Sequence, residues 1–252
     1  MGLKKHIKNF FQDALKKRGF RVSNLYNLNF FESLMYQLVR DKKHLNFIQI
    51  GANDGKRFDP MYHFVKYNKN NVQGYVVEPI HDYYKDLCHT YKTYNNIRPI
   101  NVAIHQNLNE TVIYRVAKEF EKNVPEFALG IASFDKEHHK KTNIPSHFIT
   151  KEKVKCSTLK RLIVEHKINH VDVLVLDTEG YDYEILMSLD VNEISPLLIH
   201  FEHGLKSGTM SIKEFNNVLN KMKEADYQFY IDKADVTAYK SNLVFDFNKY
   251  KD

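Results

Sequence analysis

The chain has 252 residues, of which 43% are hydrophobic, and this is enough to bury one sizeable core. No run of about 18 apolar residues occurs, so the sequence predicts no membrane-spanning helix, and the charged N-terminus lacks the apolar centre of a secretory signal. Its 37 Lys and Arg residues against 31 acidic ones give a net charge of +6, which favours anionic neighbours such as phosphate-bearing substrates, lipid headgroups or nucleic acid. We expect a cytoplasmic protein whose two cysteines, Cys88 and Cys156, stay reduced, because one pair is neither a disulfide framework nor a zinc spacing.

The first 20 residues predict a basic amphipathic helix, with apolar residues on one face and lysines around the rest. The apolar residues are Leu3, Ile7, Phe10, Phe11, Ala14 and Leu15. This helix is expected either to pack on the domain body or to lie on an anionic membrane surface, at the inner face of a membrane. A second helix is expected near residues 30–41. Residues 1–44 are therefore a predicted N-terminal helical extension of a domain at residues 45–252.

Beyond residue 44, short apolar runs rich in Val and Ile alternate with segments of helical spacing. We expect buried strands at residues 46–51, 72–78, 98–104, 171–177 and 196–202. Helices are expected at residues 61–68, 81–92, 158–167, 181–189 and 211–225. This alternation predicts an α/β fold with a mainly parallel sheet and helices on both faces. Residues 227–247 predict an antiparallel hairpin at one edge of that sheet.

Residues 105–155 interrupt this rhythm and read as an insertion. One strand is expected at residues 111–116, followed by a polar, histidine-containing loop. Such an insertion usually serves substrate recognition or covers a site. His138 and His139, followed by two lysines, are interpreted most simply as a solvated loop face; alternatively, they hold an anionic acceptor.

The stretch IGANDG, at the end of the first predicted strand, indicates a ligand site. In an open parallel sheet, ligands bind beyond the carboxyl ends of the strands, and the first strand-to-helix turn is the favoured place. Counted from Gly51, the second and third glycine positions of a dinucleotide fingerprint hold Asn53 and Lys56, and GKRF lacks the hydroxyl of a phosphate-binding loop. Both nucleotide motifs are thereby excluded. The glycines let the backbone approach a ligand, while Asn53 and Asp54 offer acceptors that suit a cationic group.

Glu78 and Pro79 end the next predicted strand. A carboxylate at that position can accept two hydrogen bonds from a ribose diol, and Pro79 removes a backbone donor beside it. Ribose next to an ammonium-bearing group describes S-adenosylmethionine. The simpler alternatives are a tight turn at residues 51–55 and a solvated strand-end charge at Glu78.

Six motifs in chain order make this sequence resemble a known family. They are FIQIGANDG, VVEP, NVAI, VKCSTL, VLVLDTEGYDYEIL and LIHFEH, and GIASFDKEHH within the insertion adds to them. Over residues 45–205 the sequence is similar to the FkbM-type family of S-adenosylmethionine-dependent methyltransferases. The combination of IGANDG with LDTEGYD is quite specific.

The resemblance implies a Rossmann-like, seven-stranded class I methyltransferase sheet in an enzyme that usually methylates oxygen on sugars or natural-product scaffolds. It also implies that Ala103 and Ile104 flank the adenine and that Ser133 reaches the same region. The candidate cofactor-binding residues are then Gly51, Ala52, Asn53, Asp54, Gly55, Glu78, Pro79, Ala103, Ile104, Ser133 and Asp177.

Asp177 and Glu179 follow the fourth strand as LDTEG, and Gly180 permits a sharp turn into the next helix. Acid pairs at a helix start often only complement the helix dipole. Here the preceding strand is wholly apolar and the pair is expected to face the cofactor turn, with Tyr181 and Tyr183 as aromatic walls. Because transfer of a methyl group to a hydroxyl requires removal of the hydroxyl proton, we assign Glu179 the role of base or acceptor-orienting residue and Asp177 a cofactor-facing role.

His200, Glu202 and His203 alternate along the end of the last parallel strand, so that His200 and Glu202 share one face and His203 opposes them. One interpretation is a divalent metal site with Asp177, but tight ligand spacing is absent and the metal is the less favoured alternative. Hydrogen-bonded core or substrate contacts are the other interpretation. We include His203 with Asp177 and Glu179 among the catalytic candidates.

Together with these patterns, the resemblance implies an O-methyltransferase that acts on a sugar hydroxyl of a polysaccharide, glycolipid or natural product. The basic surface would accommodate an anionic or lipid-linked acceptor. Nucleic-acid methylation is the second alternative, which the pI near 9.0 permits. Methylation of the amino groups of bases commonly uses an Asn/Asp-Pro-Pro-aromatic motif after the fourth strand, where this chain has DTEG. A cofactor-binding scaffold without activity is the third alternative, and the intact acid pair speaks against it.

Overall fold

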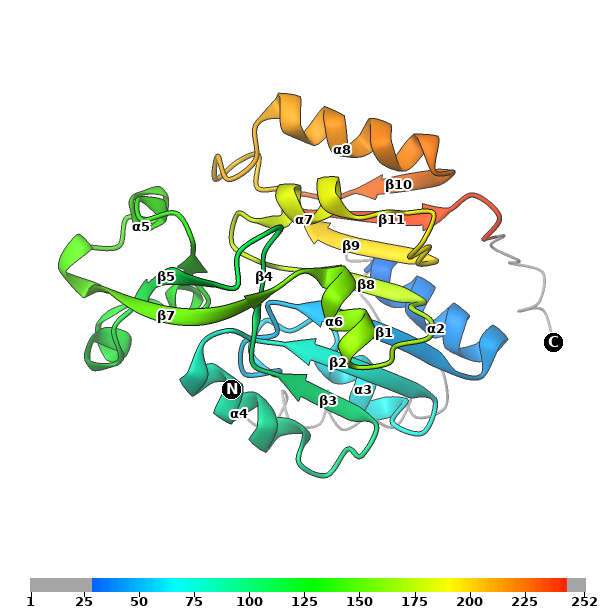
Figure 1. Ribbon diagram of the computed structural model, residues 1–252, viewed down its shortest axis with the longest axis horizontal. Helices are drawn as coiled ribbons and strands as arrows, with labels where there is room; N and C mark the ends of the chain where they lie inside the picture. The colour runs from blue at the N-terminus through cyan, green and yellow to red at the C-terminus, as the bar shows by residue number, and fades with distance from the viewer. Residues whose placement is uncertain (1–28, 244–252) are drawn as a thin grey trace, which may run out of the picture.

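A seven-stranded sheet forms the centre of the computed structural model, which describes residues 29–243 (Figure 1). The strands lie in the order β10-β11-β9-β8-β1-β2-β3. Their bounds are β1 (Leu45–Ile50), β2 (Val72–Val77), β3 (Ile97–Ile100), β8 (Val173–Leu176), β9 (Leu198–Glu202), β10 (Tyr227–Ile231) and β11 (Asp235–Lys240). The helix predicted at residues 1–20 lies outside the described residues.

The strand directions confirm the predicted mainly parallel sheet with an antiparallel edge. β1 pairs in parallel with β2 and β8, β2 with β3, and β8 with β9. β11 runs antiparallel to both β9 and β10, so the C-terminal hairpin lies at the sheet edge as predicted. The chain first builds the sheet outward from β1 to β3 and later returns to the other side of β1 with β8. In open α/β sheets, this switch point is where a ligand crevice forms.

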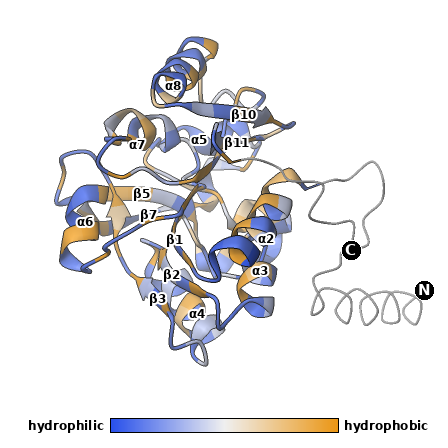
Figure 2. Ribbon diagram, turned by 90° about the vertical axis from the view of Figure 1, so that its right-hand side faces the viewer, coloured by the Kyte–Doolittle hydropathy of each residue, from blue (hydrophilic) through white to orange (hydrophobic). Residues whose placement is uncertain are grey.

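Helices cover both faces of the sheet, as predicted (Figure 2). One face carries α2 (Phe30–Lys42), α3 (Tyr62–Tyr67) and α4 (His81–Tyr91), and the other carries α6 (Leu159–Glu165), α7 (Asp182–Ser188) and α8 (Ile212–Glu224). Phe47 packs with the first set and its neighbour Ile48 with the second, because successive side chains of a strand point to opposite faces. Within residues 29–243, no helix is long and apolar enough to cross a membrane.

The insertion contains a second sheet. The strand predicted at residues 111–116 is confirmed, but the polar loop predicted after it is wrong, because two further strands follow. This sheet has the order β4-β7-β5-β6. Its strands are β4 (Ala103–Ile104), β5 (Glu110–Val116), β6 (Ala132–Ser133) and β7 (Ile149–Ser157). β7 lacks an apolar run because exposed Lys151, Lys153 and Lys155 alternate with less exposed residues. Antiparallel pairing with β5 along its length stabilises it nonetheless.

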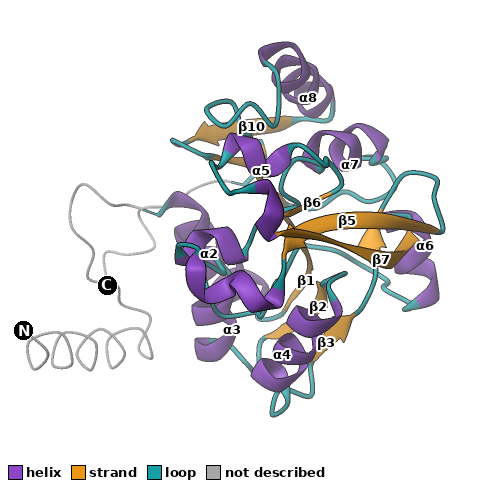
Figure 3. Ribbon diagram, turned by 90° about the vertical axis from the view of Figure 1, so that its left-hand side faces the viewer, coloured by secondary structure: helices purple, strands orange, loops and turns teal. Residues whose placement is uncertain are grey.

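The insertion lies next to the switch point of the main sheet. It projects on the side toward which the arrows of β2 and β3 point (Figure 1), and β5 and β7 form a long ribbon there (Figure 3). Its helical turns are η1 (Lys118–Asn123), η2 (Glu126–Leu129), α5 (His138–Lys141) and η3 (Ser146–Phe148). The carboxyl ends of the parallel strands thus face the insertion.

The single strand predicted at residues 98–104 is two strands. β3 stays in the main sheet, whereas β4 leaves it and pairs with β7. Asn101 holds the bend between them, because its side-chain amide donates to the carbonyl oxygens of Glu78 and Pro79 at 2.8 and 2.9 Å. These hydrogen bonds connect the bend before β4 to the segment that follows β2.

Candidate active site

The turn after β1 is held between the two neighbouring strands. The backbone N–H groups of Gly51 and Ala52 both donate to the carbonyl oxygen of Val77 at 3.0 Å, and the N–H of Asp177 donates to that of Ile50 at 3.0 Å. Gly51 has a φ of +81°, and a Cβ at this position would lie 1.7 Å from the carbonyl oxygen of Asp177. Only glycine therefore allows β1 and β8 to approach this closely.

Glu78 anchors this turn from the end of β2. Its side chain is buried, with Oε2 accepting from the N–H of Asn53 and Oε1 from the N–H of Ile80, both at 2.8 Å. Burial raises the pKa of Glu78 to about 7, although the two hydrogen bonds oppose the rise. Each carboxylate oxygen has one backbone partner and keeps a lone pair that a ligand hydroxyl can use.

A cavity of about 250 Å³, called here the first cavity, lies against the turn. The predicted site residues that line it are Gly51, Ala52, Asn53, Glu78, Pro79, Ala103, Ile104, Asp177 and Glu179. Its lining also includes residues that sequence reasoning missed: Gln49, Arg57, Phe58, Asp59, Tyr83, Phe127 and Phe134. Several of these stand in turns or in the insertion, where no periodic pattern points to a site.

Three residues predicted to bind the cofactor make local contacts and do not line the first cavity. Asp54 forms an ion pair with Arg57, with 2.5 Å between Oδ2 and Nε. Gly55 packs against α4, where an added Cβ would lie 2.5 Å from Cδ1 of Leu87. The Ser133 hydroxyl donates to the backbone carbonyl of Glu179 at 2.8 Å. Their contact with the cofactor stays a prediction.

Asp177 and Glu179 lie beyond β8, where the first cavity meets another. Both residues also line a second cavity of about 260 Å³. The surrounding protein desolvates Asp177 and, together with the negative charge of Glu179, raises the pKa of Asp177 well above its ordinary value. Glu179 has a φ of +52°, a left-handed conformation that is costly for a residue with a side chain and that clusters at functional sites.

Asp182 fixes the loop that carries the acid pair. Its Oδ2 accepts from the hydroxyl of Thr178 at 2.8 Å and from the N–H of Thr178 at 3.3 Å. Burial raises the pKa of Asp182 to about 6. The predicted aromatic walls, Tyr181 and Tyr183, do not line the first cavity. Tyr181 supports the wall from behind instead, because its ring meets that of the lining residue Phe134 edge-on at 4.9 Å.

The second cavity is acidic. Its lining consists of Phe58, Pro60, Val175, Leu176, Asp177, Glu179, His200, Glu202, Ala234 and Asp235. Burial, followed by the charge of Glu179, raises the pKa of Glu202 to about 7. Phe58 is 70% exposed. Among the described residues that line the second cavity there is neither lysine nor arginine. In the part of the chain that the structure describes, no three His, Cys, Asp or Glu residues are grouped so that they could hold a metal ion.

The two histidines near the end of β9 have different surroundings. His200 lines the second cavity, stacks on Phe31 with 4.1 Å between ring centres, and has its pKa lowered to about 4 by burial. His203 is buried elsewhere, with Nδ1 accepting from the N–H of Leu205 at 3.1 Å and its ring 5.6 Å from that of Phe215. The structure does not bring His203 to either cavity. Its catalytic role therefore stays a prediction without a supporting contact.

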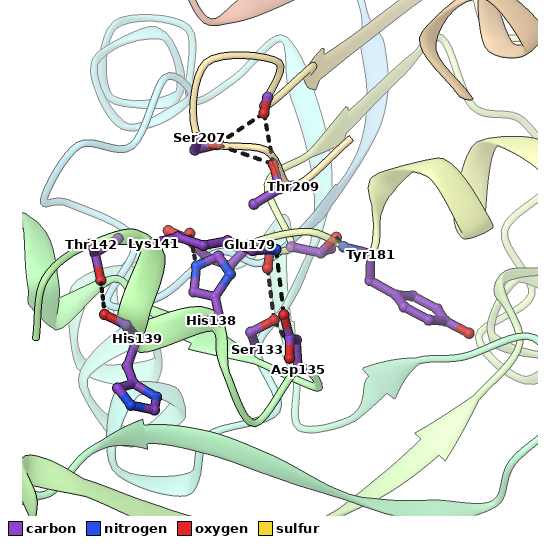
Figure 4. Close-up of polar contacts among 12 residues, drawn as sticks. Ser133, Asp135, His138, His139, Lys141, Thr142, Glu179, Tyr181, Ser207 and Thr209 are labelled. Carbon is purple, nitrogen blue, oxygen red and sulfur yellow. Dashed lines mark hydrogen bonds and ion pairs between the residues drawn. The ribbon is translucent and has the colours of Figure 1, made fainter. Parts of the chain in front are cut away.

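His138 and His139 are buried, with 3% and 8% of their surface exposed, so the predicted solvated loop face is wrong. Nε2 of His138 lies 3.3 Å from Oε2 of Glu179 (Figure 4), whereas Nδ1 of His139 contacts the carbonyl of Lys136 at 2.9 Å. The lysines that follow are typical of a surface loop. The one-turn helix α5, however, keeps both histidines under cover of the fold.

The raised carboxylate pKa values predict that the cofactor-free protein loses stability as the pH rises. Glu78 and Glu202 have pKa values of about 7 in the folded protein, against about 4.3 in an unfolded chain. Their contribution to stability is fully present below the unfolded value and is lost as the pH passes through the folded value. We expect the urea concentration at the midpoint of unfolding to decrease as the pH is raised from about 6.5 to about 8.

The pH range of this test is set by His200. Its folded pKa of about 4 lies below the unfolded value of about 6.5, so its contribution to stability is present above about pH 6.5 and is lost below it. Above that pH the two glutamates act without this opposing effect. A midpoint that stays constant or rises toward pH 8 would contradict the raised pKa values.

The chain matches one family of known proteins and is similar to several solved structures. The family model described as Methyltransferase FkbM domain matches residues 49–229, and no curated protein matches the chain significantly. Among solved structures, the chain is similar to a methyltransferase from Geobacter sulfurreducens, at 10% identity and a TM-score of 0.43, over 93% of this chain and 87% of that one. It is also similar to the human methyltransferase 10 domain containing protein, at 8% identity and a TM-score of 0.41, over 94% of this chain and 97% of that one. A third similar structure is Aeropyrum pernix fibrillarin in complex with natively bound S-adenosyl-L-methionine, at 11% identity and a TM-score of 0.38, over 77% of this chain and 65% of that one.

Proposed function

The chain belongs to the FkbM family of S-adenosylmethionine-dependent methyltransferases, and from this premise we propose that it methylates a hydroxyl group of a sugar. The observation that carries the proposal is that the two cavities share Asp177 and Glu179. A carboxylate between a cofactor cavity and a neighbouring cavity can act on a group in the second while the cofactor fills the first.

The residues of the first cavity suit S-adenosylmethionine, which supplies an electrophilic methyl group when bound. Glu78 has a free lone pair on each carboxylate oxygen for the ribose diol. Ala103 and Ile104 offer apolar surface for the adenine. Asp177 offers negative charge to the amino and sulfonium groups, and its raised pKa is expected to fall when these cations are near.

The lining of the second cavity supports a polyhydroxyl acceptor. Carboxylates of Glu202 and Asp235 can accept hydrogen bonds from sugar hydroxyls, and the exposed ring of Phe58 offers a flat apolar face to a sugar ring. Since the described lining has no basic side chain, an anionic part of the acceptor is expected to lie outside this cavity. There the overall basic charge of the protein would favour it.

In this proposal Glu179 is the general base. Its carboxylate takes the proton from the acceptor hydroxyl, while Asp177 stays ionised and keeps its charge beside the cofactor. The backbone of Glu179 is held by Ser133 and its side chain by His138. Both restraints favour one orientation of the carboxylate, which is what general-base catalysis requires.

Methyl transfer to a panel of acceptors tests the proposal. The purified full chain would be supplied with radiolabelled S-adenosylmethionine and, in separate reactions, neutral oligosaccharides, amino-sugar oligosaccharides, uronate-containing oligosaccharides and RNA. We expect label in a neutral or amino-sugar acceptor, as an ether that survives acid and base. Label found only in RNA, or bound to nitrogen, would overturn the proposal.

Removal of residues 1–18 is expected to leave the affinity for S-adenosylmethionine unchanged, because the lining of the first cavity falls within residues 49–179. If the predicted basic helix contacts a membrane, binding to anionic vesicles will fall on deletion and at high salt. Calorimetry and vesicle co-sedimentation measure the two effects. Precipitation of the shortened chain would instead favour packing of the helix on the domain, and weaker cofactor binding would contradict the prediction.

A further inference from the structure

We infer that His138 is a positioning residue that orients the carboxylate of Glu179, so that the insertion controls the geometry of the base. The inference rests on the proposed role of Glu179. Figure 4 shows the His138 ring beside Glu179, while the ring of His139 points away from it. Two adjacent histidines in one helical turn thus have different tasks.

The proposed role of Glu179 as a base, which requires an ionised carboxylate, defines the donor in its contact with His138. Nε2 of His138 lies 3.3 Å from Oε2 of Glu179, and an ionised carboxylate can only accept. Nε2 must therefore carry the hydrogen. Nδ1 is buried without a hydrogen-bond partner among the described residues, which is costly for a polar atom. A side chain with a packing role alone would be better served by an apolar residue, so the retained imidazole points to a role for Nε2.

This bond leaves one oxygen of Glu179 free. Oε2 faces His138, whereas Oε1 faces Gly130, where an added Cβ would come within 3.8 Å of it. Among the described residues none donates a hydrogen bond to Oε1, and Glu179 lines both cavities. Oε1 is thus the atom available to accept a proton where the two cavities adjoin.

A chain of hydrogen bonds in the insertion builds this arrangement. The Ser133 hydroxyl donates to the backbone carbonyl of Glu179 at 2.8 Å and accepts from the N–H of Asp135 at 3.3 Å. The carbonyl of Asp135 in turn accepts from the N–H of His138 at 3.1 Å. The insertion therefore holds the backbone and the side chain of Glu179 at once. This helps to keep Glu179 in its left-handed conformation.

Three variants of the full-length protein test the inference with the acceptor that the oligosaccharide panel identifies. His138→Ala removes the donor, and His138→Gln restores an amide N–H at a similar reach. His139→Gln is the matched control, because His139 is buried in the same turn and bonds to Lys136 instead. We expect His138→Ala to lower kcat on the order of tenfold to a hundredfold, the cost of a base misplaced by about 1 Å. KM for S-adenosylmethionine should stay constant, His138→Gln should recover most of the loss, and His139→Gln should match the unmodified protein.

A double variant separates positioning from general stability. If His138 acts through Glu179, then His138→Ala should add no further loss in a Glu179→Gln background. An equal loss in both backgrounds would make His138 a structural residue and overturn the inference. So would full activity of His138→Ala, or failure of His138→Gln to restore turnover.

Nitrogen-15 NMR of labelled histidines tests the same contact without an acceptor. In the full chain with S-adenosylhomocysteine, we expect one ring protonated at Nε2 whose signal disappears in His138→Gln and shifts in Glu179→Gln. A ring protonated at Nδ1 alone, or a signal indifferent to Glu179→Gln, would overturn the inference. If the NMR result is as expected but no glycan is methylated, the proposed acceptor class fails while the His138 contact stands.

Discussion

Glu179→Gln is expected to lower methyl transfer on the order of a hundredfold to ten-thousandfold, the usual loss when general-base catalysis is removed. The amide keeps the shape of the side chain and can still accept from His138, yet it cannot take the proton of an acceptor hydroxyl. Most of the affinity for S-adenosylmethionine should remain, because the amide preserves the shape and hydrogen bonding of the side chain and because Glu78 and Asp177 are unchanged. Steady-state turnover and calorimetry on the same preparation measure the two quantities.

Asp177→Asn is the contrasting variant. It is expected to weaken both cofactor binding and turnover, because it removes a negative charge from the cavity that would hold a cationic cofactor. A metal-dependent mechanism predicts another pattern, in which a chelator abolishes activity and magnesium or manganese restores it. Retained turnover in Glu179→Gln together with chelator sensitivity would move the catalytic role from Glu179 to a metal held by Asp177 and its neighbours.

Glu78→Ala is expected to weaken binding of S-adenosylmethionine about tenfold to a hundredfold, equivalent to ~1.5–3 kcal/mol for lost charge-assisted hydrogen bonds to ribose. The free energy of unfolding should fall as well, since the backbone N–H groups of Asn53 and Ile80 lose their buried acceptor. Calorimetry measures the affinity, and urea unfolding shows whether the variant is folded under the same conditions.

Glu202→Gln is the matched control for Glu78→Ala. Glu202 also has a pKa of about 7 but lines the second cavity and not the first, so cofactor affinity should stay constant. In the unmodified protein, affinity should rise between about pH 6 and about pH 8, because ribose hydroxyls bind the ionised form of Glu78. The Glu78→Ala variant should lose this rise. An unchanged dissociation constant in folded Glu78→Ala would show that the ribose lies elsewhere.

The main sheet could be predicted because its central strands are buried on both faces and therefore read as apolar runs. β7 could not, since exposed lysines interrupt every apolar run in it and its stability comes from pairing with β5. The break between β3 and β4 could not be predicted from the sequence either. It depends on the bonds of Asn101 to Glu78 and Pro79, and no local pattern contains these distant partners.

The candidate site likewise contains residues that could be predicted from the sequence and residues that could not. Gly51, Glu78 and Asp177 could be predicted because they follow buried strands at one edge of the sheet. Asp54 and Gly55 belong to the same motif as Gly51, yet their contacts are with Arg57 and α4. His138 reaches the site through a contact with a residue 41 positions away. The charged residues around it carry no sign of that contact.

The pairing of β1 with β8 also sets the moment in folding at which the cofactor site can exist. A hydrogen bond of 2.8 Å from the N–H of Asn46 to the carboxylate of Asp172 spans 126 positions at the start of this pair. Gly51 and Asp177 become neighbours only after β8 has joined β1, and pairings over such separations form slowly. The nascent chain thus has no complete cofactor cavity before β8 is in place. Excess S-adenosylmethionine is therefore expected to slow unfolding, by mass action on the finished fold, and to leave the rate of folding unchanged.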